Sequence, residues 1–406
     1  MRTFWRWLVR ILIALAVVAA IGAFAFRKQI SEYRAAFEYA GLFEPDVIDQ
    51  SFRSLFTKYP SVKVDKAATP SELPKAERPL PQSYSFKGET RTIADWVEKS
   101  QTTGLIVIKD GAVVHEQYLR GNTTDTQSIA MSLSKSTVSF LLGNAVADGL
   151  VKLDDPVETY APLLAEGGYK GVKVKDVLQM SSGIGFNEDY GDLSSDIVRY
   201  IIQILTGSVN DFTANLKNQD PPGTINRYVS ADTQVLGMVI EGAVKKPLAE
   251  YFSERLWSKM GAQADAYWLV DQKGEAVAAG GLNAVLRDYA RFGLLYLNEG
   301  RTAAGEQIVP AEWVRASITP DAPHLQPGRE TVNGYPVMGY GYQWWIPGAR
   351  SGGDFTGIGI YGQFIYINPE RRVVIAKTSA YADYNNSWEE MENEAIAAFQ
   401  AIANGL

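Results

Sequence analysis

The sequence of 406 residues contains no cysteine and only two histidines, His115 and His324. The absence of cysteine excludes disulfide bonds and a thiolate nucleophile. Two histidines far apart in the sequence argue against a zinc site. No G-x-S-x-G segment accompanies them to indicate a Ser-His-Asp triad of the α/β-hydrolase kind. Two common kinds of hydrolase site are therefore disfavoured by composition alone.

Basic residues are in the minority, and their distribution is uneven. The net charge is −7, yet the first 28 residues carry five basic residues and no acidic one. Subtracting this +5 from the total leaves −12 for the rest of the chain. An acidic body argues against binding to nucleic acid, because phosphates are neutralised by Lys and Arg.

Long apolar runs are also scarce, with one exception near the N-terminus. Residues 11–26 (ILIALAVVAAIGAFAF) form 16 consecutive apolar or small residues. A cleaved signal peptide would fit the basic start and the small residues Ala23-Phe24-Ala25. A retained anchor needs about 20 residues, which counting from Trp7 provides. Arg27 and Lys28 directly after the run favour the anchor.

We therefore expect residues 1–28 to be a membrane anchor or signal segment. Three arginines before the run and two basic residues after it favour a cytoplasmic N-terminus. The body would then be membrane-anchored outside the cytoplasm, for example in a periplasm, or secreted if the segment is cleaved. Residues 29–83 are expected to be a linker or wrapping arm, proline-rich from residue 60, and residues 84–406 the main domain.

Strand patterns occur near both ends of this domain, with helical patterns between them. The segments 104–109 and 112–118 flank the hairpin turn Asp110-Gly111. We therefore predict an α/β (α+β) fold in which an antiparallel sheet from both chain ends is flanked by helices, with a helical subdomain inserted between. A ligand cleft is expected where the two parts meet. Further predicted elements are helices at 132–149, 229–242 and 286–297, strands at 339–346, 358–367 and 372–378, and a final helix that includes residues 388–402.

The segment Ser132-Leu133-Ser134-Lys135 is the first candidate for chemistry. Residues three apart share a helix face, so the Lys135 amine can reach the Ser132 hydroxyl. At a helix N-terminus the serine's own N–H can stabilise an oxyanion, and the helix dipole and desolvation favour a neutral lysine base. The alternative is an N-cap serine beside a solvated lysine, and the four residues alone favour that alternative.

A second element strengthens the catalytic interpretation. Pro222-Gly223-Thr224 fixes a loop that leads to Tyr228, and a helix is expected to begin near Ser230. A tyrosine hydroxyl in such a loop can carry a proton between serine, lysine and leaving group, and Ser230 can bond to Lys135. A lone tyrosine among 21 is usually a packing residue.

Together these motifs resemble the serine β-lactamase and penicillin-binding superfamily. The class C β-lactamase-like serine hydrolases, which include carboxylesterases, D-amino-acid peptidases and 6-aminohexanoate-dimer hydrolases, are the most similar branch. The segment 176–183 resembles the family's "LL-x-M-x-SG" pattern, and residues 280–293 resemble its "GGL…RD-x-A-R-F-G" pattern. The resemblance covers roughly residues 85–405, and it implies a β-lactamase/transpeptidase-like fold.

The family's third element, K-T-G or H-x-G, is altered in this sequence. Gly357-Ile358-Gly359 stands at that position, so a glycine is kept but the basic side chain is lost. In β-lactamases and D,D-peptidases that cation helps to hold the substrate carboxylate, so its loss disfavours penicillins and peptidoglycan stems. The resemblance implies an oxyanion hole from the N–H groups of Ser132 and Ile360, with Gly359 beside it.

Residues that contact substrate are harder to assign. The resemblance to aminohexanoate hydrolases implies that an acid near Asp189 or Glu188 contacts the substrate amine, although a solvated acidic loop is the simpler interpretation. Tyr342, Trp344 and Trp345 are candidates for a pocket wall, but half of an alternating aromatic strand normally belongs to the core, so only one or two are expected to face a ligand.

We predict a serine hydrolase that cleaves a small-molecule amide or ester through an acyl-enzyme on Ser132, with no metal and no cofactor. Lys135 is the predicted base, Tyr228 the predicted proton relay, and Ser230 orients both. A 6-aminohexanoate-oligomer hydrolase-like activity is expected, with a β-lactamase or D-alanyl carboxypeptidase as the alternative. A protein that binds peptides or wall fragments without turnover is the alternative of another class.

Overall fold

The computed structural model describes residues 4, 5, 7, 12, 13 and 26–406. A seven-stranded antiparallel sheet forms the centre of the molecule, in the order β11-β12-β13-β14-β15-β4-β5. Its strands come from both ends of the main domain, as the sequence predicts. Their bounds are β4 (Thr102–Lys109), β5 (Ala112–Tyr118), β11 (Gly339–Tyr340), β12 (Trp345–Ile346), β13 (Phe355–Gly359), β14 (Gln363–Asn368) and β15 (Val373–Ser379).

The β4–β5 hairpin shows why the predicted turn forms. Asp110 and Gly111 have φ angles of +53° and +82°. Two consecutive residues with positive φ match a turn whose twist suits the flanking strands, and Asp and Gly adopt it at low cost. Val107 and Ile108 are fully buried, so β4 is a central strand of the sheet rather than a surface strand.

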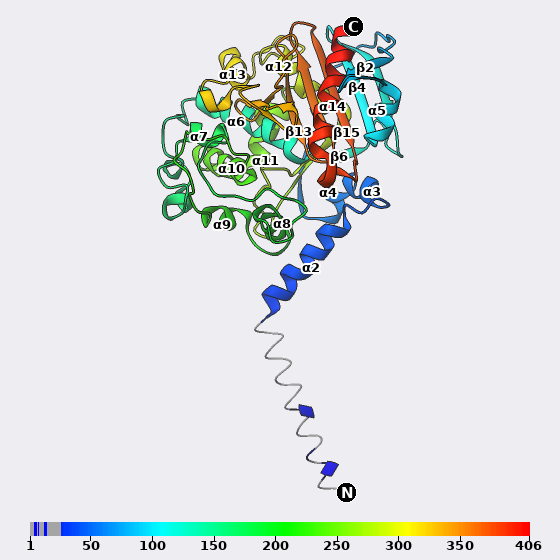
Figure 1. Cartoon of the computed structure of the whole chain (residues 1–406). Helices are drawn as coiled ribbons and strands as arrows, with labels where there is room; N and C mark the ends of the chain where they lie inside the picture. The colour runs from blue at the N-terminus through cyan, green and yellow to red at the C-terminus, as the bar shows by residue number, and fades with distance from the viewer. Residues whose placement is uncertain (1–3, 6, 8–11, 14–25) are drawn as a thin grey trace.

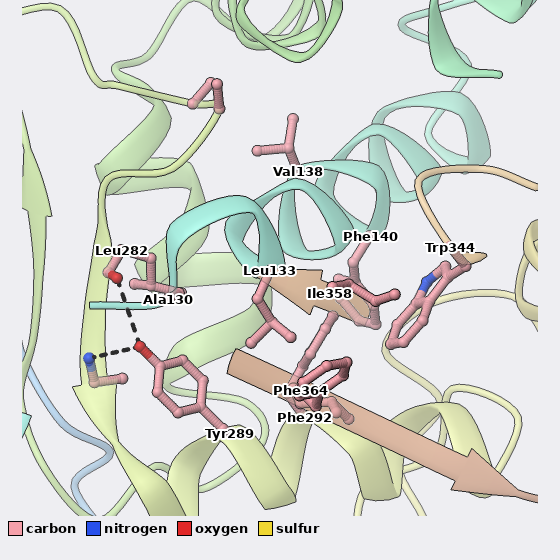
Figure 2. Packing of buried hydrophobic residues seen from close by; sticks show 14 of the residues in the cluster. Ala130, Leu133, Val138, Phe140, Leu282, Tyr289, Phe292, Trp344, Ile358 and Phe364 are labelled. Atoms are coloured by element: carbon pink, nitrogen blue, oxygen red, sulfur yellow. Dashed lines mark hydrogen bonds between the residues drawn. The ribbon is translucent and has the colours of Figure 1, made fainter. Parts of the chain in front are cut away.

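Helices cover both faces of this sheet (Figure 1). On one face, Leu133 and Phe140, at the start and in the middle of the segment around α6 (Ser134–Ala147), pack beside Phe292 of α12 (Leu286–Leu297), as Figure 2 shows. Burying such side chains is the main source of stability. On the other face lie α5 (Ile93–Lys99) and α14 (Tyr384–Gly405), where Phe399 contacts Trp96 edge-on.

Two predicted late strands are corrected by the structure. The segment 339–346 is two short strands, β11 and β12, which pair with each other rather than forming one strand. The segment 358–367 contains the end of β13, a turn and β14. Tyr361 and Gly362 form that turn with φ angles of +63° and +92°, a conformation that β-branched patterning does not reveal.

The middle of the chain forms the predicted helical part, which also carries a second sheet in the order β1-β7-β8-β6. The α6 helix packs against α10, so the two parts share one core. The helices of this part are α7 (Val174–Leu178), α8 (Asp196–Thr206), α9 (Val209–Ala214), α10 (Ser230–Val244), α11 (Leu248–Phe252) and α13 (Ala311–Ser317), and its strands are β6 (Gln127–Ile129), β7 (Ala266–Leu269) and β8 (Leu282–Val285). Short 3-10 or π turns lie at Met131–Leu133 (η1), Val157–Thr159, Pro162–Glu166, Ser253–Trp257 and Pro323–Leu325. A small hairpin consists of β9 (Thr331–Val332) and β10 (Tyr335–Pro336).

The segment before the main domain is folded onto the body. The α2 helix (Arg27–Gly41) contacts α8, and its C-terminal end lies beside α3 (Ile48–Phe52) and α4 (Leu55–Lys58) (Figure 1). The proline-rich stretch is extended: β1 (Ser61–Val64) pairs with β7, and Ser71 accepts hydrogen bonds from Arg291. A hairpin of β2 (Ser83–Phe86) and β3 (Glu89–Thr92) follows.

The expected membrane anchor is not supported, and the location inferred from it is corrected. Across the part of the chain that the structure describes, no helix combines the length and apolar character needed to cross a bilayer. The α2 helix is 15 residues long and contains charged side chains, and α14 is longer but rich in Glu and Asn. Most of the predicted apolar run, residues 11 and 14–25, lies outside the described residues.

Candidate active site

Ser132 lies in the short turn η1 (Met131–Leu133) directly before α6. The backbone here is held tightly: the N–H of Ala130 donates a 2.7 Å hydrogen bond to the carbonyl of Leu282 in β8. Met131 has a φ of +50°, an uncommon conformation for a non-glycine residue. The chain therefore bends sharply before the serine, whose side chain is placed at the boundary between the sheet and the helical part.

Lys135 lies one turn further along and is 2% exposed. Its Nζ donates to the Oγ of Ser132 at 2.9 Å, the Oγ of Ser230 at 3.1 Å and the carbonyl of Ala279 at 2.7 Å. Burial lowers the pKa of Lys135 to about 8, while the negative charge of Glu188 partly opposes this shift. The lysine can thus be neutral near physiological pH.

Ser230 connects the lysine to an acid. Its hydroxyl donates a 2.5 Å hydrogen bond to one carboxylate oxygen of Glu188, and its backbone N–H donates to the other at 3.0 Å. Tyr190 also donates to this carboxylate, at 2.9 Å. Burial raises the pKa of Glu188, although the Lys135 charge and the Ser230 hydrogen bonds lower it in part. Ser230 therefore lies between the Lys135 amine and the Glu188 carboxylate.

Tyr228 lies above the pair, with its ring centroid 5.1 Å from the Nζ of Lys135. The ring stacks on Trp345 at a centroid distance of 5.3 Å and meets Tyr340 edge-on. Burial raises the pKa of Tyr228 well above its ordinary value, and an interaction with Ser132 lowers it in part. The hydroxyl is therefore protonated and close to the Ser132 side chain.

The loop that carries Tyr228 is fixed by the segment that resembles the family's "SG" pattern. The N–H of Arg227 donates to the carbonyl of Met180 at 2.9 Å, and that of Gly223 donates to Ser181 at 2.7 Å. Gly183 has a φ of +77°, and a Cβ there would lie 2.0 Å from the carbonyl oxygen of Asp220. Only glycine permits this approach, which positions the tyrosine loop.

Gly359 and Ile360 come from the end of β13. A Cβ on Gly359 would lie 2.3 Å from the carbonyl oxygen of Ala130, so glycine allows β13 to touch the segment before Ser132. Ile360 consequently lies beside Ser132, and both residues line the same cavities. The predicted oxyanion pair is thus brought together from segments far apart in the sequence.

Two cavities meet at Ser132, Tyr190 and Ile360. The outer cavity has a volume of about 740 Å³, and Tyr228, Trp345, Ile358 and Glu392 are among its lining residues. The inner cavity has a volume of about 120 Å³ and is lined by Lys135, Ser230 and many apolar side chains. Ser132 therefore borders two separate cavities.

Some predicted site residues lie elsewhere. Trp344 is fully buried against Tyr296 and Phe355, and Tyr342 packs on Trp313, so neither lines the outer or the inner cavity. Trp345, the third candidate, lines the outer cavity. Asp189 lies at the outer cavity but is exposed, and its carboxylate accepts from the N–H of Gly191.

Several cavity residues were not found from the sequence. Glu392 and Tyr384 of α14 line the outer cavity, and the tyrosine hydroxyl donates to the carboxylate at 2.9 Å. Burial raises the pKa of Glu392 to about 7. Trp388, in the predicted final helix, is 48% exposed at this cavity. Trp388 and Glu392 are four residues apart, a spacing that could have indicated a shared face.

Comparison with known proteins agrees with this geometry. The beta-lactamase family model matches residues 90–398, which is more than half of the chain. The chain belongs to the beta-lactamase family. A 6-aminohexanoate-dimer hydrolase from Paenarthrobacter ureafaciens is 31% identical over 71% of this chain and 74% of its own length. Within this family, these matches identify the chain as a serine hydrolase.

More distant family members share parts of the chain or the fold alone. An Escherichia coli protein provisionally named a D-alanyl-D-alanine carboxypeptidase is 23% identical over 44% of this chain and 43% of its own. A Bacillus anthracis structure, provisionally named a 6-aminohexanoate-dimer hydrolase, superposes with a TM-score of 0.79 at 23% identity. It covers 89% of this chain and 95% of its own, which shows that the β-lactamase/transpeptidase-like fold is shared.

Proposed function

We propose that the chain hydrolyses an amide or ester through a covalent acyl-enzyme on Ser132. The observation that carries the proposal is the buried Lys135, whose amine contacts the Ser132 hydroxyl at 2.9 Å. As a neutral base, Lys135 takes the hydroxyl proton while the Ser132 oxygen bonds to the substrate carbonyl carbon. The N–H groups of Ser132 and Ile360 stabilise the resulting oxyanion.

Tyr228 completes the cycle. Its hydroxyl passes the proton from Lys135 to the nitrogen or oxygen of the leaving group as the bond to the acyl carbon breaks. A water molecule then loses a proton to the same pair and attacks the acyl-enzyme, which releases the acid and restores Ser132. Ser230 and Glu188 keep the lysine amine in position, and they do not touch the reacting atoms.

An amide or ester with a cationic group is the substrate class we favour for the outer cavity. Its lining contains five acidic side chains and one basic side chain, Arg329. This charge attracts an ammonium group and repels a carboxylate. Gly357, at the position of the family's cation, has no side chain, and its neighbour Ile358, which lines the same cavity, offers no charge to a penicillin carboxylate.

The test is the intact mass of the full-length protein after incubation with a fluorophosphonate, with Ser132→Ala as the matched control. One adduct on the wild type and none on the variant would support the nucleophile. Turnover of 6-aminohexanoate dimer, D-alanyl amides and nitrocefin then separates the substrate classes. No adduct on folded wild-type protein would overturn the proposal in favour of a binding protein without turnover, and rapid nitrocefin turnover would favour a β-lactamase.

A further inference from the structure

The inner cavity is built partly by the segment that precedes the main domain. Its apolar lining comes from two directions: from α2 and the loop after it, and from one face of α8. These two elements contact each other (Figure 1). The side chains that matter here are Tyr39, Leu42, Phe43, Ile201, Ile204 and Leu205.

The wall from the N-terminal side is firmly packed. Phe43 stacks on Tyr361, at a centroid distance of 4.7 Å, in the turn that follows Ile360. Tyr39 contacts Phe43 edge-on at 4.8 Å, and Leu42 is 9% exposed. The segment 39–43 is therefore tied to the same turn that brings Ile360 beside Ser132. A displacement of residues 39–43 would therefore also affect the position of Ile360 beside Ser132.

The position of Tyr228 decides which part of a substrate enters which cavity. Tyr228 lines the outer cavity and not the inner one. Since it is the proposed proton donor to the leaving group, the leaving group must lie in the outer cavity. A tetrahedral centre on Ser132, with its oxyanion near Ile360, then directs the acyl chain to the other side, which is the inner cavity.

We infer that the inner cavity binds the acyl chain of the substrate, and that this chain is apolar and short, with residues 39–43 setting its length. This inference rests on the proposed acyl-enzyme at Ser132. A dry cavity of ~150 Å³ holds a molecule the size of benzene, so a volume of about 120 Å³ suits about five carbon atoms. A charged chain end is disfavoured there, because it would be desolvated among apolar side chains.

The experiment is a chain-length series of 4-nitrophenyl esters, from acetate to decanoate, on the full-length protein. The leaving group is constant, so only the acyl chain varies. Each methylene that becomes buried should raise kcat/KM about fourfold, with an optimum near pentanoate or hexanoate and a fall for decanoate. The 6-aminohexanoyl ester should be poorer than the hexanoyl ester, since its ammonium group would enter the inner cavity.

Two variants probe the two walls. Ile201→Phe fills the cavity from α8 and should move the optimum to acetate, with hexanoate losing about tenfold relative to acetate. Leu42→Ala enlarges it from the N-terminal side and should move the optimum to longer chains. Phe37→Ala is the control in α2, the helix directly before Leu42, because Phe37 is 75% exposed and lines neither cavity. It should leave the profile of the wild type unchanged.

The outcomes separate this inference from the proposed function. A fluorophosphonate adduct with a flat chain-length profile, or equal losses on all esters in Ile201→Phe, would overturn the acyl-cavity assignment and leave the nucleophile intact. No adduct and no ester turnover would overturn both. Melting temperatures identify a variant that fails to fold, and Ile201→Phe then decides the question if Leu42→Ala is too unstable to measure.

Discussion

The hydroxyl of Ser230 donates a 2.5 Å hydrogen bond to Glu188 and accepts one of 3.1 Å from Lys135. Ser230 therefore connects the buried Lys135 amine to the Glu188 carboxylate. The Glu188 charge raises the pKa of Lys135, against the larger effect of burial, so that the lysine titrates at about 8. The Glu188 carboxylate is therefore linked to the Lys135 amine by the Ser230 hydroxyl and also interacts with it electrostatically.

We expect kcat/KM to rise with pH and to level off above about 8, because only the neutral amine can accept the Ser132 proton. Glu188→Gln removes the charge that raises the lysine pKa, so the rising limb should move to lower pH. Asp189→Asn is the matched control, since Asp189 is exposed and bonds only within its own loop. If the rising limb of kcat/KM lies at the same pH in Glu188→Gln as in the wild type, the effect of Glu188 on the Lys135 pKa is contradicted.

Tyr228→Phe should lower kcat for an amide about 100- to 10,000-fold, the usual range for loss of a general acid–base group. The acylation burst with a 4-nitrophenyl ester should fall much less, because nitrophenolate leaves without being protonated. Tyr340→Phe, a neighbour that contacts the same ring, is the control. Equal losses on amide acylation and ester acylation would show that Tyr228 holds the site together rather than moving a proton.

Gly359→Ala should impair both folding and activity. The added methyl group would meet the Ala130 carbonyl oxygen at 2.3 Å, and overpacking of this kind typically costs about 1–3 kcal/mol. Because Ala130 precedes the Ser132 turn, the fluorophosphonate reaction should slow as well. Gly41→Ala, with no atom within 4 Å of the new methyl group, is the control for stability. An unchanged melting temperature in Gly359→Ala would contradict the close approach.

Lys377 offers a test of stability against pH. It is buried in the sheet with its amine beside the Ser379 hydroxyl and over the Trp96 ring, and burial lowers its pKa from 10.5 to about 7. The unfolded chain thus binds a proton between these values that the folded chain does not. This group makes the protein more stable as pH rises from about 7 to 10 and less stable below that range.

We expect Lys377→Met to raise the free energy of unfolding at pH 6 by about 2 kcal/mol or more and to flatten its dependence on pH. Urea unfolding at several pH values measures both effects. Lys175→Met is the control, since that lysine is paired with Asp321 at the surface. A variant less stable than the wild type at every pH would mean that the amine has a favourable role in the sheet.

The sequence is most informative where one element has a regular pattern. Residues 286–297 were predicted to be a helix and form α12, and the Asp110-Gly111 turn joins two strands as expected. The Ser132–Lys135 contact also follows from local helix spacing. In each case the deciding interaction is between residues near each other in the chain.

Prediction from the sequence was weaker where contacts between distant segments of the chain determine the position of a side chain. Two adjacent tryptophans point to opposite sides of a strand, and only the fold shows that Trp345 rather than Trp344 faces the cavity. Glu188 looks like a surface acid until the loop with Ser230 is placed beside it. The contribution of Leu42 to the inner cavity depends on α2 packing against α8, a contact that no local pattern indicates.

Ser132 and Ile360 stand in different halves of the sequence, and the central sheet is closed only when β15 pairs with β4. During synthesis on the ribosome Ser132 emerges long before β13, the strand whose end brings Ile360 beside it. Pairing between such distant segments is slow to form. A premature stop before β13 would therefore release a chain that carries Ser132 but lacks Ile360 and the strand that places it.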